Sequence, residues 1–131
     1  MPIEHIRLSQ QAKDQLTRLK RSTGLKHWNE LCRWAFCLSL ADPTIPAQAK
    51  IPTDSSIEMT WKIFAGHHQE IYWALLKVRC EQDGLGTSED VLTTQFKLHL
   101  HRGIGFLAAD RQLKTISDLL KKAQTVSFEL T

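Results

Sequence analysis

Cysteine is scarce in this sequence: three residues occur in 131, and none of them stands in a Cys-x-x-Cys pair. An odd number of cysteines without that spacing argues against a disulfide framework and against a thiolate-bound zinc or iron-sulfur site. We therefore expect Cys32, Cys37 and Cys80 to be reduced and to serve as small buried hydrophobic residues.

Long apolar runs are also missing. No stretch approaches the roughly 20 apolar residues that a membrane span requires, and the N-terminus lacks the apolar run of a signal peptide. We expect a cytoplasmic protein that makes no contact with a membrane. The length and the hydrophobic content of 42% fit one core, so residues 1–131 are predicted to form a single domain.

Catalytic and cofactor motifs are absent as well. Residues 102–105, Arg-Gly-Ile-Gly, lack the preceding strand and the third glycine of a dinucleotide-binding loop, and no Walker lysine motif occurs. The pairs His67–His68 and His99–His101 do not place both rings on one helix face, and no carboxylate spacing completes a metal site. No Ser-His-Asp or Cys-His arrangement can be assigned. The sequence predicts that the protein is not an enzyme and uses neither a cofactor nor a metal.

The charge is unevenly distributed, although the net charge is only +3. Residues 1–41 carry seven lysines and arginines against three acids, residues 42–90 carry four against eight, and residues 91–131 carry six against three. If the two basic ends share a face, that face offers a positive strip to phosphates, and its affinity falls steeply with salt.

Residues 5–41 predict a short strand followed by two helices. Ile6 and Leu8 alternate with polar neighbours, as in a half-buried strand. Ser9 is a candidate N-cap for the next helix, and Gly24 suits the left-handed position that ends it near residue 22. The first helix has its buried stripe at Ala12, Leu16 and Leu19. The second helix, over residues 28–40, is predicted to bury Trp28, Leu31, Cys32, Ala35, Leu38 and Ser39.

The rest of the chain predicts a connector, one strand and three helices. Residues 42–56 hold three of the four prolines and form the connector. The alternation over residues 57–64 favours a strand that pairs with residues 5–8. A helix is predicted over residues 68–81, and the Thr-Ser-Glu-Asp run at 87–90 opens a long one. The fold class is therefore mainly α, a compact helical domain with a short strand element.

Each predicted helix has an expected buried stripe. The long helix carries Gly103 on its apolar side, which indicates close helix approach inside the fold or between subunits. A last helix is predicted over residues 111–123, with Lys114, Lys121 and Lys122 outward. The expected stripes are Ile71, Ala74, Leu75 and Val78 for the helix at 68–81, Leu92, Phe96, Leu100 and Leu107 for the long helix, and Leu113, Ile116, Leu120 and Ala123 for the last.

Two resemblances follow from these motifs. The order strand, helix, Thr-Gly turn and helix over residues 1–41 resembles the ribbon-helix-helix unit of DNA-binding proteins. The strings TGLKHWNELCRWAFCLSL (23–40) and HLHRGIGFLAAD (99–110) resemble the DndE family of DNA sulfur modification proteins, and this likeness fits the whole chain. It implies a small helical homo-oligomer, with a tetramer suggested, that binds double-stranded DNA, intact or nicked, without performing the sulfur chemistry.

The expected function is that of a non-catalytic accessory protein of DNA phosphorothioate modification. It would contact the phosphate backbone and other proteins of the DNA sulfur modification machinery. On the strand only His5 and Arg7 could read bases, and there is no Asn or Gln for adenine. A ribbon-helix-helix repressor or antitoxin, and a structural adaptor that binds no DNA, are the alternatives. The predicted phosphate-contacting residues are Arg7, Lys13, Arg18, Lys20, Arg21 and Lys26, whereas Gly24 is assigned to turn geometry and possible subunit approach.

Overall fold

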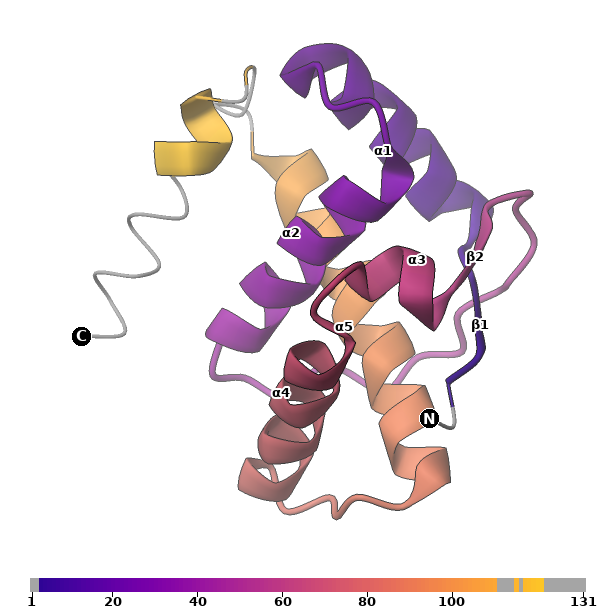
Figure 1. Cartoon of the computed structure of the whole chain (residues 1–131), viewed down its shortest axis with the longest axis vertical. Helices are drawn as coiled ribbons and strands as arrows, with labels where there is room; N and C mark the ends of the chain where they lie inside the picture. The colour runs from indigo at the N-terminus through magenta and orange to yellow at the C-terminus, as the bar shows by residue number, and fades with distance from the viewer. Residues whose placement is uncertain (1–2, 111–114, 116, 122–131) are drawn as a thin grey trace.

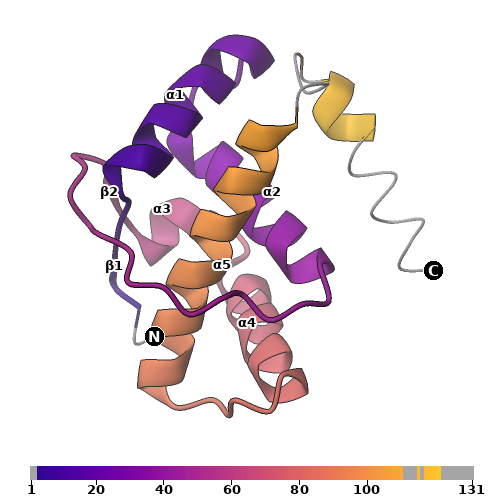
Figure 2. The same cartoon turned by 180° about the vertical axis from the view of Figure 1, so that it is seen from behind.

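Helices wrap around one central helix in the computed structural model, which describes residues 3–110, 115 and 117–121 (Figures 1 and 2). The mainly α fold with a minor strand element is confirmed. In chain order the elements are β1 (His5–Arg7), α1 (Gln10–Thr23), α2 (Trp28–Ala41), β2 (Glu58–Thr60), α3 (Trp61–Ala65), α4 (Gln69–Gln82) and α5 (Glu89–Ala109). No helix in the described part of the chain is long and apolar enough to cross a membrane.

The strand β1 and the helix α1 fold as the pattern predicts. Ile6 and Leu8 are buried, whereas the residues between and before them are exposed. Ser9 caps α1, because its hydroxyl accepts a hydrogen bond from the Ala12 N–H at 3.1 Å. Gly24 has a φ of 74° and its N–H donates to the carbonyl of Lys20, so the helix ends in a left-handed turn.

The two strands form one antiparallel pair within the chain. His5 lies opposite Thr60, and Arg7 lies opposite Glu58. The prediction that the strand near residue 60 pairs with residues 5–8 is thus confirmed. In ribbon-helix-helix proteins two chains supply the ribbon, so this detail of the N-terminal resemblance stays unconfirmed.

The predicted strand over 57–64 is wrong beyond residue 60. The Thr60 hydroxyl accepts from the Ile63 N–H at 3.2 Å and opens the short helix α3. Trp61 and Phe64, at helical spacing, are buried, and Ile63 is 54% exposed. The extended backbone therefore holds for three residues only, after which a helix cap decides the backbone, although buried and exposed residues still alternate as far as Lys62.

Helix α5 runs through the middle of the molecule, and α2 crosses it (Figure 2). A Cβ atom added at Gly103 would lie 1.7 Å from the carbonyl oxygen of Ala35. The predicted close approach at Gly103 is confirmed, and it occurs inside the fold. Phe36, absent from the predicted stripe of α2, is fully buried, with its ring 5.2 Å from that of Phe96 and 5.7 Å from that of Phe64.

Helix α4 shows the opposite face from the one predicted. Its outer stripe, defined as Ile71, Ala74, Leu75 and Val78, was expected in the core, but all four residues are exposed. The buried side holds Leu76, Arg79 and Cys80 instead. Tyr72 and Trp73 also turn inward, where their rings contact those of Phe64 and Trp61.

The connector over residues 42–56 contains neither helix nor strand, as predicted, and crosses α5 in the view of Figure 2. In the predicted last helix, Leu113, Ile116 and Ala123 lie outside the described residues, as do Lys114 and Lys122. Residues 117–121 are helical and Lys121 is exposed. The assignment of Leu120 to the buried stripe is wrong, because Leu120 is 55% exposed and its neighbour Leu119 is buried.

Candidate nucleic-acid interface

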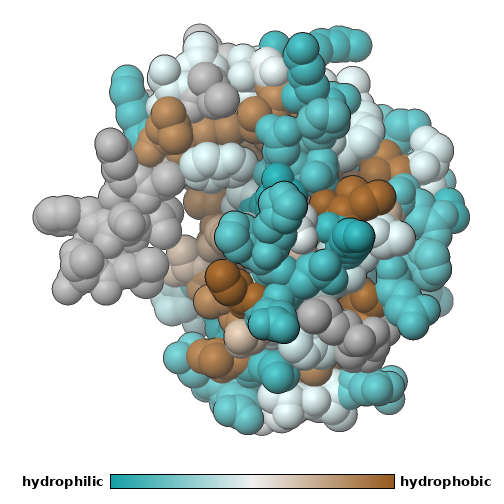
Figure 3. Space-filling view, viewed as in Figure 1, coloured by the Kyte–Doolittle hydropathy of each residue, from teal (hydrophilic) through white to brown (hydrophobic). Residues whose placement is uncertain are grey.

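The solvent side of α1 carries most of the predicted phosphate-contacting residues. The helix packs Ala12, Leu16, Leu19 and Thr23 against the core. Arg18 and Arg21 are exposed on the other side, Lys13 and Lys20 are half-buried at its border, and Lys26 is exposed in the turn before α2. A band of hydrophilic side chains runs down the face shown in Figure 3. The sequence therefore brings five cations to one helix and its exit turn.

Two of these lysines are held in place by neighbours. The Lys13 ammonium donates a hydrogen bond to the hydroxyl of Ser56 at 2.6 Å. The Lys20 ammonium lies 4.0 Å from the centroid of the Trp28 ring, a cation–π contact. Neither contact neutralises the charge. Both reduce the side-chain entropy that a lysine loses when it binds a phosphate.

The five cations of α1 and its exit turn form no ion pair with a described residue. Among the described residues, the cationic members of ion pairs are His5, Arg7 and Arg79. One carboxylate, that of Asp14, lies on the same helix, where it accepts a hydrogen bond from the Gln10 amide at 3.0 Å. The positive charge of this surface therefore remains available to an anion from solution.

Arg7 differs from the other predicted residues. Its guanidinium lies 2.7 Å from the Glu58 carboxylate and donates to the carbonyl oxygen of Ser55 at 3.1 Å. These contacts follow from the register that places Arg7 opposite Glu58. A phosphate at this position would share Arg7 with a carboxylate, so its contribution to binding is smaller than that of an unpaired arginine.

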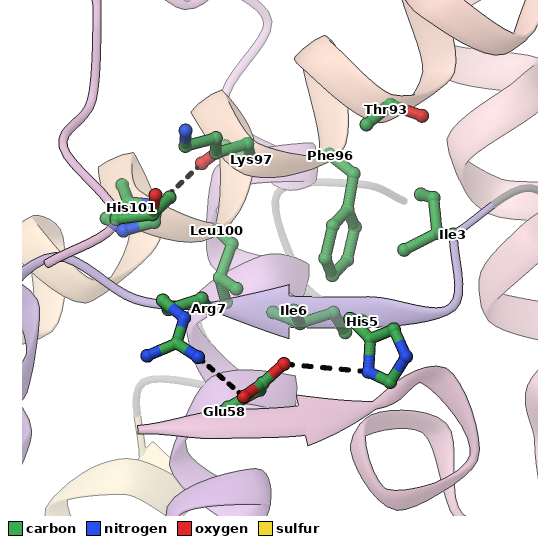
Figure 4. A pocket seen from close by; sticks show the side chains of 11 residues that line it. Ile3, His5, Ile6, Arg7, Glu58, Thr93, Phe96, Lys97, Leu100 and His101 are labelled. Carbon is green, nitrogen blue, oxygen red and sulfur yellow. Dashed lines mark hydrogen bonds and ion pairs between the residues drawn. The ribbon is translucent and has the colours of Figure 1, made fainter. Parts of the chain in front are cut away.

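A hollow of about 320 Å³ opens beside Arg7, between β1 and α5 (Figure 4). Its lining combines apolar and polar side chains: Ile3, His5, Ile6, Arg7, Thr53, Glu58, Thr93, Phe96, Lys97, Leu100 and His101. Lys97 was not among the predicted residues, although it adds a second cation to the lining of this hollow. No local pattern could predict this, because Lys97 and Arg7 are 90 residues apart in the chain and line one hollow only through the fold.

His101, on the same hollow, joins α5 to the start of α1. Its Nε2 accepts from the backbone N–H of Ser9 at 3.2 Å. The proton therefore lies on Nδ1, which donates to the carbonyl of Lys97 at 2.8 Å. Burial lowers the pKa of His101, and the neutral form is the one that both hydrogen bonds require. His101 is thus a structural link between the two helices.

A buried Ser–His pair lies on the other side of α5. The hydroxyl of Ser39 is 2.8 Å from Nδ1 of His99, and both residues have no exposed surface. Burial, followed by the charges of Arg79 and Arg102, lowers the pKa of His99 to about 4. The side chain of Arg102 also donates to the Ser39 hydroxyl. Because solvent cannot reach Ser39 or His99, this pair contributes to the packing of α2 against α5.

Arg79 and Arg102 hold the connector onto the helices. Arg79 donates to the carbonyl oxygens of Leu40, Asp42 and Thr44, and it pairs with Asp83 at 2.9 Å. Arg102 donates to the carbonyl of Thr44 as well. These two arginines therefore add to the formal charge of the chain without forming part of the α1 surface.

The cysteines are partly as expected. Cys32 and Cys80 are buried, and all three thiols are free. Burial raises the pKa of Cys32 to about 12 and also raises that of Cys80. The prediction that Cys37 is a core residue is wrong, because it lies on the exposed side of α2. In the described part of the chain no three His, Cys, Asp or Glu residues are grouped so that they could hold a metal ion.

The sequence of this chain matches the model of one known protein family. The sequence model of "DNA sulphur modification protein DndE" matches residues 5–115, which includes α1, its exit turn and both crossing helices. The chain belongs to the DndE family. A match of this extent covers the whole described fold up to the end of α5, so the earlier resemblance is confirmed. Among curated proteins, none matches the chain.

Two solved DndE structures share the fold. The crystal structure of DndE from Escherichia coli B7A, described as involved in DNA phosphorothioation modification, has a TM-score of 0.66 and 24% identity, over 79% of this chain and 95% of that one. The DndE G21/24K mutant, also described as involved in DNA phosphorothioation, has a TM-score of 0.61 and 23% identity, with the same coverage. The family therefore connects this fold with DNA sulfur modification.

Proposed function

We propose that this DndE-family protein is a non-catalytic, DNA-binding accessory factor of DNA phosphorothioate modification. It contacts the phosphate backbone of double-stranded DNA, intact or nicked, through α1 and the turn that follows. Several copies assemble into a homo-oligomer, which acts in the cytoplasm with other proteins of the modification machinery. The observation that carries the proposal is the set of five cations on α1 and its exit turn, none of which has an ion-pair partner among the described residues.

The dimensions of α1 support backbone binding. Its 14 residues extend about 20 Å, and duplex DNA carries one negative charge per roughly 1.7 Å of its axis. A helix of this length with cations along its solvent side can therefore meet several phosphates at once. Binding releases the counterions condensed on the DNA, which makes the affinity strongly dependent on salt.

The strand supports sequence-independent rather than sequence-specific binding. β1 pairs with β2 of the same chain, whereas a repressor ribbon uses strands from two chains. Its outward residues are His5 and Arg7, and both contact Glu58. Neither can make the bidentate contact by which Asn or Gln reads adenine.

The buried Ser–His pair supports the non-catalytic part of the proposal. A nucleophile that cleaves DNA must touch a phosphodiester, and neither Ser39 nor His99 has exposed surface. Arg102 also donates to the Ser39 hydroxyl, which is thereby engaged in the packing of the connector.

The decisive experiment replaces Lys13, Lys20 and Lys26 together by glutamate. We expect binding to every duplex sequence to weaken similarly, and the slope of log affinity against log salt to flatten by about 3. Filter binding or gel shifts at two or more salt concentrations measure both quantities. The variant Lys50→Glu/Lys62→Glu, which changes exposed lysines outside α1, is the control. Unchanged affinity of the triple variant would refute the location of the interface.

The same assay separates the alternatives. Parallel series with intact, nicked and single-stranded DNA establish the preferred form. Competition by random duplex distinguishes backbone binding from an operator-specific repressor. A structural adaptor would show no DNA binding at any salt concentration, and nicking of supercoiled plasmid in the presence of magnesium would contradict the non-catalytic role.

A further inference from the structure

The outer stripe of α4 is apolar surface without a cover among the described residues. Three of its four side chains are large, and they are 56% (Ile71), 42% (Leu75) and 53% (Val78) exposed. The opposite face of the same helix packs Leu76 and Cys80 into the core. A helix that is apolar on opposite sides is typical of one that is buried on both. The sequence of α4 thus fits a helix with a second partner.

Charged residues beside the outer stripe indicate what that partner is. Glu70 and Lys77 are both exposed, and because they are seven residues apart they lie on the same flank of the stripe, about 10 Å apart along the axis. That distance is too long for an ion pair within one helix. Neither residue forms an ion pair with any other described residue. The flank therefore presents Lys77 between two acids, Glu70 and the exposed Glu81 four residues further on, and none of the three forms an ion pair with a described residue.

A second α4 running antiparallel complements this pattern. If a two-fold axis passes close to Ala74, Glu70 of each copy lies level with Lys77 of the other, and two ion pairs form. Ala74, the smallest residue of the stripe, then lies where the helices cross and lets them approach closely. Antiparallel helix dipoles add a favourable term. Parallel pairing would instead place the two charged flanks on opposite sides of the contact, where Glu70 cannot meet Lys77 of the other copy.

We propose that two copies of this chain associate through the outer stripe of α4, antiparallel, with reciprocal Glu70–Lys77 ion pairs on the flank. The inference rests on the proposed homo-oligomer and names the surface that builds it. A contact of this symmetry closes at two copies, so a tetramer would need one further surface. Loss of the α4 contact halves the assembly in either case.

The first test places a charge in the stripe. Leu75→Glu puts an unpaired carboxylate between the two helices, and we expect the molar mass measured by light scattering after gel filtration to fall to half. Glutamate suits an exposed helix position, so the far-ultraviolet circular dichroism should be unchanged. Lys50→Glu, on the connector and exposed, is the control and should keep the mass of the parent.

The second test exchanges the two charges. Glu70→Lys alone and Lys77→Glu alone each turn two attractive pairs into two repulsive ones, and each should raise the dimer dissociation constant by at least about tenfold. The double variant Glu70→Lys/Lys77→Glu restores both pairs with inverted sign. Its dissociation constant should return to within about threefold of the parent value.

The outcomes separate this inference from the proposed function. A parent chain that is monomeric at every concentration overturns the homo-oligomer and this interface together. A parent that is oligomeric while Leu75→Glu leaves its mass unchanged overturns the α4 interface alone. A charge exchange that weakens association further than either single variant overturns the antiparallel arrangement.

Discussion

Helices α5 and α4 each carry an apolar stripe in the sequence, but only α5 turns that stripe inward. Leu92, Phe96, Leu100 and Leu107 of α5 are buried, whereas the outer stripe of α4 is exposed. The difference lies in what the other side of each helix carries. α4 has Tyr72 and Trp73 next to Leu76, and these aromatic rings reach Phe64 and Trp61. Periodicity finds an apolar face, but it does not say which of two such faces meets the core.

A buried arginine reinforces the choice made by α4. The side chain of Arg79 forms four hydrogen bonds, three of them to carbonyl oxygens of residues 40–44 and one to Asp83. Rotating the outer stripe inward would break these bonds and take the Arg79 donors away from the carbonyls of Leu40 and Asp42, while the carbonyl of Thr44 would keep its bond from Arg102. The hydrogen bonds of Arg79 and the aromatic contacts of Tyr72 and Trp73 together stabilise the fold more than burial of the three large side chains of the outer stripe would.

The largest expected effect tests the close crossing that fixes α5. In Gly103→Ala the added Cβ would overlap the backbone of Ala35 on α2, so the two helices must move apart. We expect the free energy of unfolding to fall by about 3 kcal/mol or more, measured by urea titration.

Gly105→Ala is the matched control two residues later on the same helix. Nothing lies within 4 Å of a Cβ at this position, so alanine should stabilise α5 by about 0.5–1 kcal/mol. Equal effects of the two substitutions would show that α2 and α5 are not in contact at Gly103.

The sequence predicted those parts of the fold that local chemistry decides. The cap at Ser9, the turn at Gly24 and the small residue at Gly103 each depend on neighbours in the chain or on the absence of a side chain. Helix α3 was missed because the cap formed by Thr60 interrupts an apparent alternation. In the candidate site, the cations of α1 could be located from helical spacing.

The side chains that the predicted cations contact could not be located from the sequence. The contact between Arg7 and Glu58 spans 51 residues, and it follows from a strand register that no local pattern specifies. The same holds for Lys97, which reaches the hollow beside Arg7 only because α5 packs along β1. Local spacing thus finds which residues are charged, and tertiary packing decides which of them remain free.

The next prediction compares neighbouring leucines on the two faces of α4. Leu76 is fully buried and Leu75 is not. Leu76→Ala should lower the free energy of unfolding by about 3 kcal/mol, because it removes buried methyl groups and leaves a cavity. Leu75→Ala should cost less than about 0.5 kcal/mol in dilute solution, where the chains are dissociated. The reverse order would mean that α4 buries the face predicted from periodicity.

The smallest expected effect concerns the buried His99 of α5 and depends on pH. Its pKa is about 4 in the folded chain and 6.5 when exposed, so between these values the unfolded state binds more protons and acidification destabilises the fold. At pH 5 the loss in the free energy of unfolding amounts to about 2 kcal/mol relative to pH 7.

His99→Asn keeps a polar group near the Ser39 hydroxyl but does not titrate. The loss of stability from pH 7 to pH 5 should therefore be smaller in the variant by about this amount, as urea titrations at the two pH values would measure, while His101 contributes equally to both proteins. If parent and variant lose stability equally, His99 is not held neutral by burial and by the charges of Arg79 and Arg102, and the polar side of α5 is more accessible to water than its apolar side.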